Sequence, residues 1–125
     1  MIKIKYPKVE DIIKANKKVL EVHKATKADS HKLLSSRYSI QKVINKAKRI
    51  KGDIYAKARI LLVGINRGHF FASGNKRTAY FVVNNFLYQN KEYSLSEKKE
   101  KRRFMLKVRS GNARDGEIEK WLGKK

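Results

Sequence analysis

The segment 68–79 contains the residues whose types and spacing could do chemistry. It reads GHFFASGNKRTA and places His69 near Gly74, Lys76 and Arg77. The ordinary pKa of histidine, about 6.5, makes His69 the obvious proton acceptor of this segment at neutral pH. A glycine before a helix N-terminus is typical of an anion site, because the first-turn N–H groups and the helix dipole favour negative charge. With two cations beside that glycine, the segment predicts a phosphate-bearing substrate next to a base, as a group-transfer reaction requires.

The same segment lacks carboxylates, since no Asp or Glu occurs between Asp53 and Glu92. Asn75 offers an amide and Ser73 a hydroxyl, so a di- or triphosphate fits the segment better than a carboxylate ligand would. The chain has no cysteine, and its three histidines have no metal-ligand spacing. We therefore predict no metal site made by the protein, and we expect any Mg²⁺ to be held mainly by nucleotide phosphates.

Each of these residues has a simpler explanation when it is considered alone. A histidine at the end of an apolar stripe is commonly a packed or capping residue, and Gly74-Asn75 is an ordinary turn signal. Phe71 is expected in the core in either case. The spacing from Gly68 to Lys76 misses the pattern G-x4-G-K-[ST], and the segment joins two predicted helices, which excludes a P-loop NTPase.

Helices must position this segment, because apolar residues recur at helical spacing along most of the chain and the single proline lies near its start. The stripes of the first three predicted helices are Val9, Ile12, Ile13, Asn16, Leu20 and His23; Ile40, Val43, Ile44 and Ala47; and Ile54, Ala58, Leu61, Leu62 and Ile65. Asp53 is the predicted N-cap of the third helix, after a break at Gly52. Continuing the third stripe by four places reaches His69, which is therefore expected where a core-facing helix ends.

The second half of the chain predicts three more helices. Residues 77–88 are apolar on most sides, which predicts a central helix that is packed by the others and ends at Asn90. Residues 96–111 predict a charged helix that ends at Gly111, and Asp115 is the predicted N-cap of a short last helix. The inward-facing residues of these last two helices are predicted to be Phe104, Met105 and Val108, then Ile118, Trp121 and Leu122. The chain is therefore predicted to be all-α.

Length and charge limit the possible functions. A chain of 125 residues with 41% hydrophobic content has enough apolar side chains for one core, so residues 1–125 are predicted to form a single domain. No segment has the apolar pattern of a signal peptide or membrane span, so a cytoplasmic protein without membrane contact is expected. The formal charge of +21 favours polyanionic partners. The basic run at 96–103 is typical of a solvated helix face, and a nucleic-acid surface is the alternative.

The combined pattern HFFASGNKRTA resembles the signature of the Fic/Doc superfamily. It is most similar to the death-on-curing (Doc) branch, because Lys76 stands where the Fic branch usually has a second glycine. The resemblance extends to AKARILLVGINRG before it and to YFVVNNFLYQNKEYSL and EIEKWL after it, over residues 53–122, while the first half matches mainly in helical layout. It implies a compact single-domain helical bundle around a central apolar helix.

The resemblance also implies roles for individual residues. His69 would be the base that deprotonates a hydroxyl of a target protein, and Phe71 would anchor the loop in the core. Lys76 and Arg77 would act in catalysis by stabilising the charge that develops in the transition state. The residues expected to contact the nucleotide are Ser73, Gly74, Asn75, Lys76 and Arg77.

Ser73 and Tyr80 also depart from the Fic pattern, in addition to Lys76. Ser73 stands where the family has an acid that helps to hold Mg²⁺, and Tyr80 stands where Fic sequences have a final arginine, as expected for Doc. The chain also lacks the self-inhibitory motif [Ser/Thr]-x-x-x-Glu-[Gly/Asn] of the family. By resemblance, this absence implies inhibition by a separate acidic antitoxin.

The expected function is therefore that of a Doc-like enzyme, which uses ATP to phosphorylate a hydroxyl of a target protein and is the toxin of a toxin–antitoxin pair. The resemblance implies a translation factor as the target. Three alternatives stay open. They are AMP transfer of the Fic type, a binding module of the same fold whose catalysis is impaired by the change at Ser73, and a basic nucleic-acid-binding protein in which His69 is structural.

Overall fold

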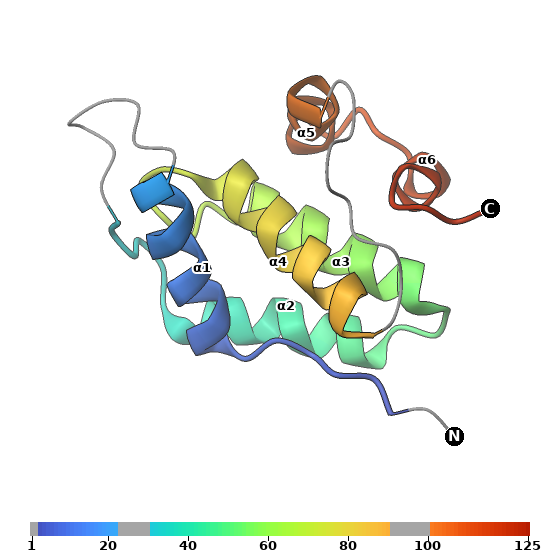
Figure 1. Cartoon of the computed structure of the whole chain (residues 1–125), viewed down its shortest axis with the longest axis horizontal. Helices are drawn as coiled ribbons and strands as arrows, with labels where there is room; N and C mark the ends of the chain where they lie inside the picture. The colour runs from blue at the N-terminus through green and yellow to red at the C-terminus, as the bar shows by residue number, and fades with distance from the viewer. Residues whose placement is uncertain (1–2, 23–30, 91–100) are drawn as a thin grey trace.

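The chain is helical in the ranges that the computed structural model describes, which are residues 3–22, 31–90 and 101–125. The helices are α1 (Val9–Val22), α2 (Arg37–Arg49), α3 (Ile54–Arg67), α4 (Asn75–Gln89), α5 (Lys101–Arg109) and α6 (Asp115–Trp121), shown in Figure 1. No strand occurs in these ranges apart from one isolated bridge between Leu33 and Phe71. The prediction of an all-α fold is confirmed.

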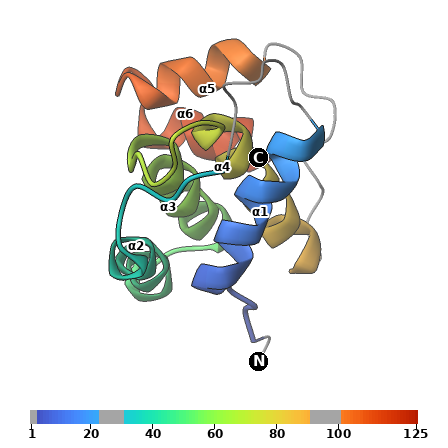
Figure 2. The ribbon, with the colours of Figure 1, turned by 90° about the vertical axis from the view of Figure 1, so that its left-hand side faces the viewer.

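The bundle is built around two helices rather than one. α3 and α4 lie side by side along the long axis of the molecule (Figure 1) and pack closely on each other. α4 also contacts α1 and α5, as predicted for a central helix, while α3 contacts α2, α5 and α6. Figure 2 shows α5 and α6 on one side of this pair and α2 on the opposite side. The loop that joins α3 to α4 therefore lies at one end of the core.

One hydrophobic core draws side chains from all of these helices. The predicted apolar stripes account for it, because Ile12, Ile40 and Leu61 are fully buried on three different helices. Burying a side chain of this size contributes about 1.5–3 kcal/mol. Trp121 is only half-buried, because it lies at the edge of the bundle. There its ring stacks on Phe104, with 4.4 Å between the ring centroids. His23, which was predicted to continue the first stripe, lies outside the described residues.

The helices end close to the residues at which the sequence predicts their ends. α4 ends at Gln89 with Asn90 as its C-cap, and α5 ends two residues before Gly111. The expected start of the charged helix, in residues 96–100, lies outside the described ranges. Among the described helices, none combines the length and the apolar character that crossing a membrane would require.

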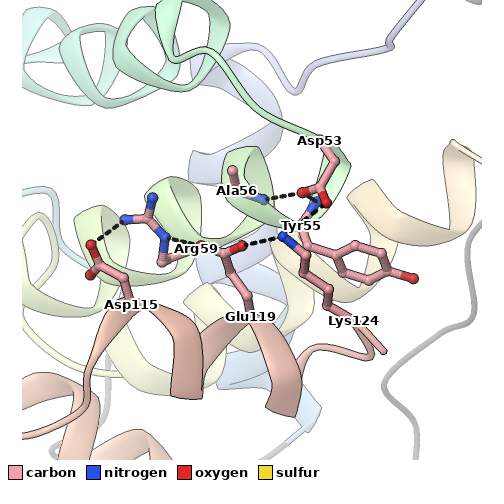
Figure 3. Close-up of polar contacts among 7 residues, drawn as sticks. All are labelled: Asp53, Tyr55, Ala56, Arg59, Asp115, Glu119 and Lys124. Atoms are coloured by element: carbon pink, nitrogen blue, oxygen red, sulfur yellow. Dashed lines mark hydrogen bonds and ion pairs between the residues drawn. The ribbon is translucent and has the colours of Figure 1, made fainter.

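Asp53 caps the N-terminus of α3, as predicted (Figure 3). Its carboxylate accepts hydrogen bonds from the N–H groups of Tyr55 and Ala56, both at 3.0 Å. These two donors belong to the first turn of the helix, where no intrahelical acceptor is available. The cap therefore fixes the residue at which α3 begins. The start of the helix in turn sets the position of its other end, where the loop to α4 begins.

Ion pairs join α6 to the N-terminal half of α3 (Figure 3). Arg59 lies 2.9 Å from Glu119 and 3.4 Å from Asp115. Lys124 lies 3.2 Å from Glu119 and 3.1 Å from Asp53. The Arg59–Glu119 pair is 13% exposed on both sides, so it is screened less by salt than the outer contacts. The network holds the last helix against the outside of α3.

The predicted N-cap of α6 was wrong by one residue. Arg114 is the N-cap and Asp115 is the first residue of the helix. The carboxylate of Asp115 reaches across to Arg59 instead of capping its own helix. The Arg114 N–H group donates to the Glu117 carboxylate, at 3.4 Å.

Replacing Asp53 with alanine is expected to lower the free energy of unfolding by about 0.5–2 kcal/mol at pH 7. Partial burial alone would raise the pKa of Asp53, but hydrogen bonds from Ala56 and Lys124 outweigh it, and the net pKa lies below its ordinary value. A lowered pKa means that the stabilisation is present above about pH 4 and is lost as the pH falls through the folded-state value. Urea unfolding followed by circular dichroism at pH 7 and at pH 3 measures both effects.

The matched control is Asp115→Ala, since that carboxylate is 74% exposed and caps no helix. Its effect on unfolding should be smaller than that of Asp53→Ala at pH 7. An equal loss of stability for Asp53→Ala at both pH values would contradict the assigned role of the charged cap.

Candidate functional site

The loop 68–74 joins α3 to α4 and contains two residues with a left-handed backbone. His69 has φ +51°, and Gly74, the N-cap of α4, has φ +77°. His69 is the one non-glycine residue with positive φ in the described part of the chain. Histidine tolerates this region better than most residues, but such a conformation still stores about 1–3 kcal/mol of strain. Strain of this kind is common at functional sites.

His69 lies directly after the C-cap of the core-facing helix α3, close to where the sequence placed it, but its side chain does not continue the apolar stripe. The helix ends at Arg67, and Gly68 is its C-cap. The backbone reverses at the next residue, and the side chain of His69 is exposed rather than packed on the core. An exposed imidazole at the end of a core helix is accessible to a substrate.

Glycine is required at both ends of the loop. A Cβ atom on Gly68 would lie 2.6 Å from the carbonyl oxygen of Gly64 and 2.7 Å from the Phe70 ring. A Cβ atom on Gly74 would lie 3.0 Å from Leu20 in a backbone conformation that side chains disfavour. The start of α4 therefore approaches α1 closely.

The loop pairs with the segment before α2 through two backbone hydrogen bonds. The N–H group of Leu34 donates to the carbonyl of Phe70 at 2.7 Å, and that of Ala72 donates to the carbonyl of Lys32 at 2.9 Å. No pattern in the sequence indicates this antiparallel bridge. It holds the loop at the residues on either side of Phe71.

Phe71 and Asn75 fix the loop from the inside. The Phe71 side chain is 1% exposed. The Asn75 side chain accepts from the Phe71 N–H group at 3.1 Å and donates to the Phe71 carbonyl at 2.8 Å. Since both ends of the amide are hydrogen-bonded to Phe71, the Asn75 side chain holds the loop in place, and its backbone N–H group lies in the first turn of α4, where anions bind.

A buried asparagine on α1 links the loop to the first turns of α4. Asn16 is fully buried, and its Nδ2 atom donates to the Ser73 carbonyl at 2.9 Å and to the Thr78 hydroxyl at 3.0 Å. Its Oδ1 atom lies 2.7 Å from Nδ1 of His31. The Ser73 carbonyl can only accept, so the amide orientation is fixed and Nδ1 of His31 carries the proton.

His31 is the neutral member of this network. Burial lowers the pKa of His31, and the charge of Lys17 lowers it further. Its ring packs on Phe71 with 5.8 Å between ring centroids. The neutral imidazole therefore supports the loop by packing and by its hydrogen bond to Asn16. Sequence reasoning missed His31, although a polar Asn16 on an apolar stripe was an available signal.

Positive charge is concentrated at the start of α4, where Lys76 and Arg77 lie in the first turn. Partial burial lowers the pKa of Lys76. The nearby charges of Arg109, Arg102 and Arg77 lower this pKa further. The two arginines of α5 therefore act on the same site as the predicted residues, and sequence reasoning missed them.

α5 is held over the start of α4 by specific contacts. Met105, which lies between the two arginines on one helical stripe, is 3% exposed. Its carbonyl accepts a hydrogen bond from Asn66 of α3 at 2.9 Å. Lys101 lies over the Tyr80 ring, 4.3 Å from its centroid. Basic side chains of α5 therefore border α4 at its first two turns.

Ser73 does not present its side chain to a ligand. The Ser73 hydroxyl is buried and makes no hydrogen bond within the described part of the chain. The loop and α4 contain no carboxylate, and no cluster of metal-ligating side chains occurs among the described residues. The site therefore fits an anion such as a nucleotide phosphate, and Mg²⁺ would find no carboxylate ligand in the loop.

The predicted residues lie together in this geometry. His69 is exposed at the end of α3, and the candidate cations Lys76 and Arg77 are half-buried in the first turn of α4. Gly74 gives α4 a left-handed start, while the side chains of Ser73 and Asn75 are turned to the interior of the loop. The arrangement combines an exposed imidazole with a cationic helix N-terminus.

One known protein family matches the part of the chain that contains this site. The Fic/DOC family matches residues 6–87, from the segment before α1 to the last turns of α4. No curated protein matches the chain. The family match includes the two N-terminal helices and leaves out α5 and α6, where the EIEKWL part of the resemblance lies. Because the match covers well over half of the chain, the protein belongs to the Fic/DOC family.

Proposed function

We propose that the protein transfers the γ-phosphate of ATP to a hydroxyl of a target protein. Membership of the Fic/DOC family suggests a function of the nucleotide-transferase type. The observation that carries the finer proposal is the exposed His69 on a loop that leads directly into the cationic first turn of α4. A base and an anion site joined by one rigid loop are the two parts that such a transfer needs.

In the proposed reaction, His69 accepts the proton of the target hydroxyl as its oxygen attacks the γ-phosphorus. A bond forms between that oxygen and the γ-phosphorus, and the bond to the β–γ bridging oxygen breaks. ADP leaves with the electron pair. Lys76 and Arg77 stabilise the charge on the transferring and leaving groups. Mg²⁺ bound to the nucleotide would add to this neutralisation, with the phosphates as its main ligands.

The choice of the γ-phosphate rests on Lys76. A glycine at this position would let the phosphates approach the bare backbone, whereas a lysine fills that space and adds a cation. The resemblance to Doc implies the reversed nucleotide orientation that goes with this lysine. We therefore favour phosphorylation over AMP transfer.

Incubating the protein with translation factors and ATP labelled at either the γ- or the α-phosphate tests the proposal. Label on a target from γ-labelled ATP alone is the expected result. Label only from α-labelled ATP would establish AMP transfer instead. If neither label is retained on any target while ATP still binds, the protein is a binding module with impaired catalysis.

Replacing Arg77 with alanine is expected to weaken ATP binding by about 10- to 100-fold, because hydrogen bonds to charged groups contribute about 1.5–3 kcal/mol. The double variant Arg102→Ala/Arg109→Ala should weaken it by about 3- to 10-fold, since these side chains act from the edge of the site. Isothermal titration calorimetry measures both.

The control for the α5 arginines is Arg103→Ala, which removes an exposed cation from the same helix. It should change ATP affinity by less than about twofold. Equal ATP affinity in the wild type and Arg77→Ala would remove the proposed site. A protein that binds nucleic acid instead would lose affinity steeply with salt and respond little to Arg77→Ala.

We also propose that a small acidic protein, an antitoxin encoded with it, controls the protein in trans. The formal charge of +21 would speed the capture of an acidic partner. In this proposal the protein is toxic when it is expressed alone, and the partner relieves the toxicity. Harmless expression of the folded protein without any partner would argue against it.

A further inference from the structure

A basic groove runs between α2 and α3 and reaches the loop of the candidate site. It has a volume of about 480 Å³. Its side on α2 carries Lys42, Lys46 and Arg49, and its side on α3 ends at Gly68. Phe70 also lines it. The groove therefore includes Gly68 and Phe70, the two residues that flank His69 in the chain.

The charged side chains that line the groove are all positive. Lys42, Lys46 and Arg49 follow each other at spacings of four and three residues, which places them on one face of α2. All three side chains are exposed. None of the described residues that line the groove is acidic, and none of the three cations pairs with a carboxylate in the described part of the chain.

The floor of the groove is fixed by close packing of the two helices. Gly64 of α3 lies against Val43 of α2, where a Cβ atom would come within 2.4 Å of a Val43 methyl group. Any side chain at this position would push the helices apart. The distance between the cations of α2 and the end of α3 is therefore set by the fold.

We propose that this groove binds an acidic segment of the target protein and thereby brings a neighbouring hydroxyl to His69. The inference rests on the proposed function and names the class of substrate that it acts on. From Tyr38 to Arg49 the groove follows α2 for about 17 Å, which an extended chain covers with about five residues. The acids of the substrate should therefore lie within about five residues of the acceptor hydroxyl.

The aromatic side chains of the groove favour a polypeptide over a single-stranded nucleic acid. Nucleic-acid binding of that kind depends on successive bases stacking on exposed rings. Tyr38 is 69% exposed, but Lys42 already lies 5.5 Å from its ring centroid. Phe70 is 4% exposed and has no free ring face to offer. Among the residues that line the groove, Tyr38 is thus the one exposed ring, which is less than the row of rings on which successive bases stack.

Binding is tested with two labelled peptides of about twelve residues that have the same composition. One places four Glu residues within five positions of a single Ser, and the other places them at the opposite end of the peptide. An oligothymidylate of similar charge is the third probe. Fluorescence anisotropy at about 0.15 M salt measures affinity for the wild type and for Lys42→Ala/Lys46→Ala/Arg49→Ala.

The matched control is Lys14→Ala/Arg103→Ala/Lys120→Ala, which removes the same number of exposed cations outside the groove. We expect the groove variant to weaken binding of the acidic peptides by about tenfold or more and the control by less than about twofold. ATP affinity should be unchanged in both. An equal loss in the control variant, or no peptide binding by the wild type, overturns the proposal.

Transfer of label from ATP to Ser provides the second readout. The wild type should label the peptide with adjacent acids faster than the peptide with distant acids. Peptide binding that depends on the three cations without any labelling would support the groove and contradict the proposed reaction, so the two failures are distinguishable. Loss of oligothymidylate binding rather than peptide binding in the groove variant would overturn the proposal in favour of nucleic acid.

Discussion

Replacing His69 with alanine is expected to slow group transfer by about 10²- to 10⁴-fold, the range typical for the loss of a general base. The affinity for ATP should change by less than about twofold, because His69 is separated from Lys76 and Arg77 by the loop and by Gly74. Labelling rates at saturating ATP measure the first quantity, and calorimetry measures the second. A variant that keeps its transfer rate would exclude His69 as the base.

His69→Gly is the matched control, since it also removes the imidazole but places a residue there that readily adopts the left-handed backbone. Glycine adopts φ +51° without strain, whereas alanine does not. The glycine variant should therefore be inactive, like the alanine variant, yet more stable than it by about 1 kcal/mol in urea unfolding. Equal stability of the two variants would show that the left-handed backbone at this position stores little energy.

Replacing Phe71 with alanine is expected to lower the free energy of unfolding by about 3–5 kcal/mol, the usual range for a buried phenylalanine. The ring is 1% exposed and packs on His31 and Phe70. Its loss would leave a cavity beneath the loop, so the transfer rate should fall as well. Urea unfolding and the labelling assay measure the two effects.

Phe71→Leu keeps the test informative if the alanine variant does not fold, because a smaller change in volume should reduce stability by only about 1–2 kcal/mol. Phe104→Ala serves as the control, since that ring is half-buried against Trp121 at the edge of the bundle. It should lower stability without changing the transfer rate of the folded protein. A full transfer rate in folded Phe71→Ala would show that the loop does not depend on this anchor.

The sequence predicted the helices well because helical periodicity is a local property. Ile12, Ile40 and Leu61 were assigned to buried faces, and Asp53 was assigned to a cap, from neighbours within a few turns. The stripe of α3 placed His69 near the end of that helix, but periodicity does not reveal that the backbone reverses there. Gly68 ends α3 two residues after Asn66, and the next residue is left-handed.

The supports of the candidate site could not be predicted in the same way, because they join distant parts of the chain. Asn16 and Ser73 are 57 positions apart, and Asn66 and Met105 are 39 positions apart. Neither contact leaves a local pattern in the sequence. Arg102 lies in the basic run at 96–103 and Arg109 lies beyond it, and only the packing of α5 over α4 relates the two to Lys76.

We expect the bridge between the loop and the segment before α2 to form late in folding, and the site with it. α3 and α4 are neighbours in sequence and can pair early, but the loop between them is completed only when residues 32–34 and Asn16 dock on it. Contacts between distant residues generally form late, because the intervening chain must first be closed. A partly folded chain can therefore already have its helical pair while it still lacks an ordered site. Under the proposed function, activity would arise only at the last step of folding, when the proposed antitoxin could also recognise the finished surface.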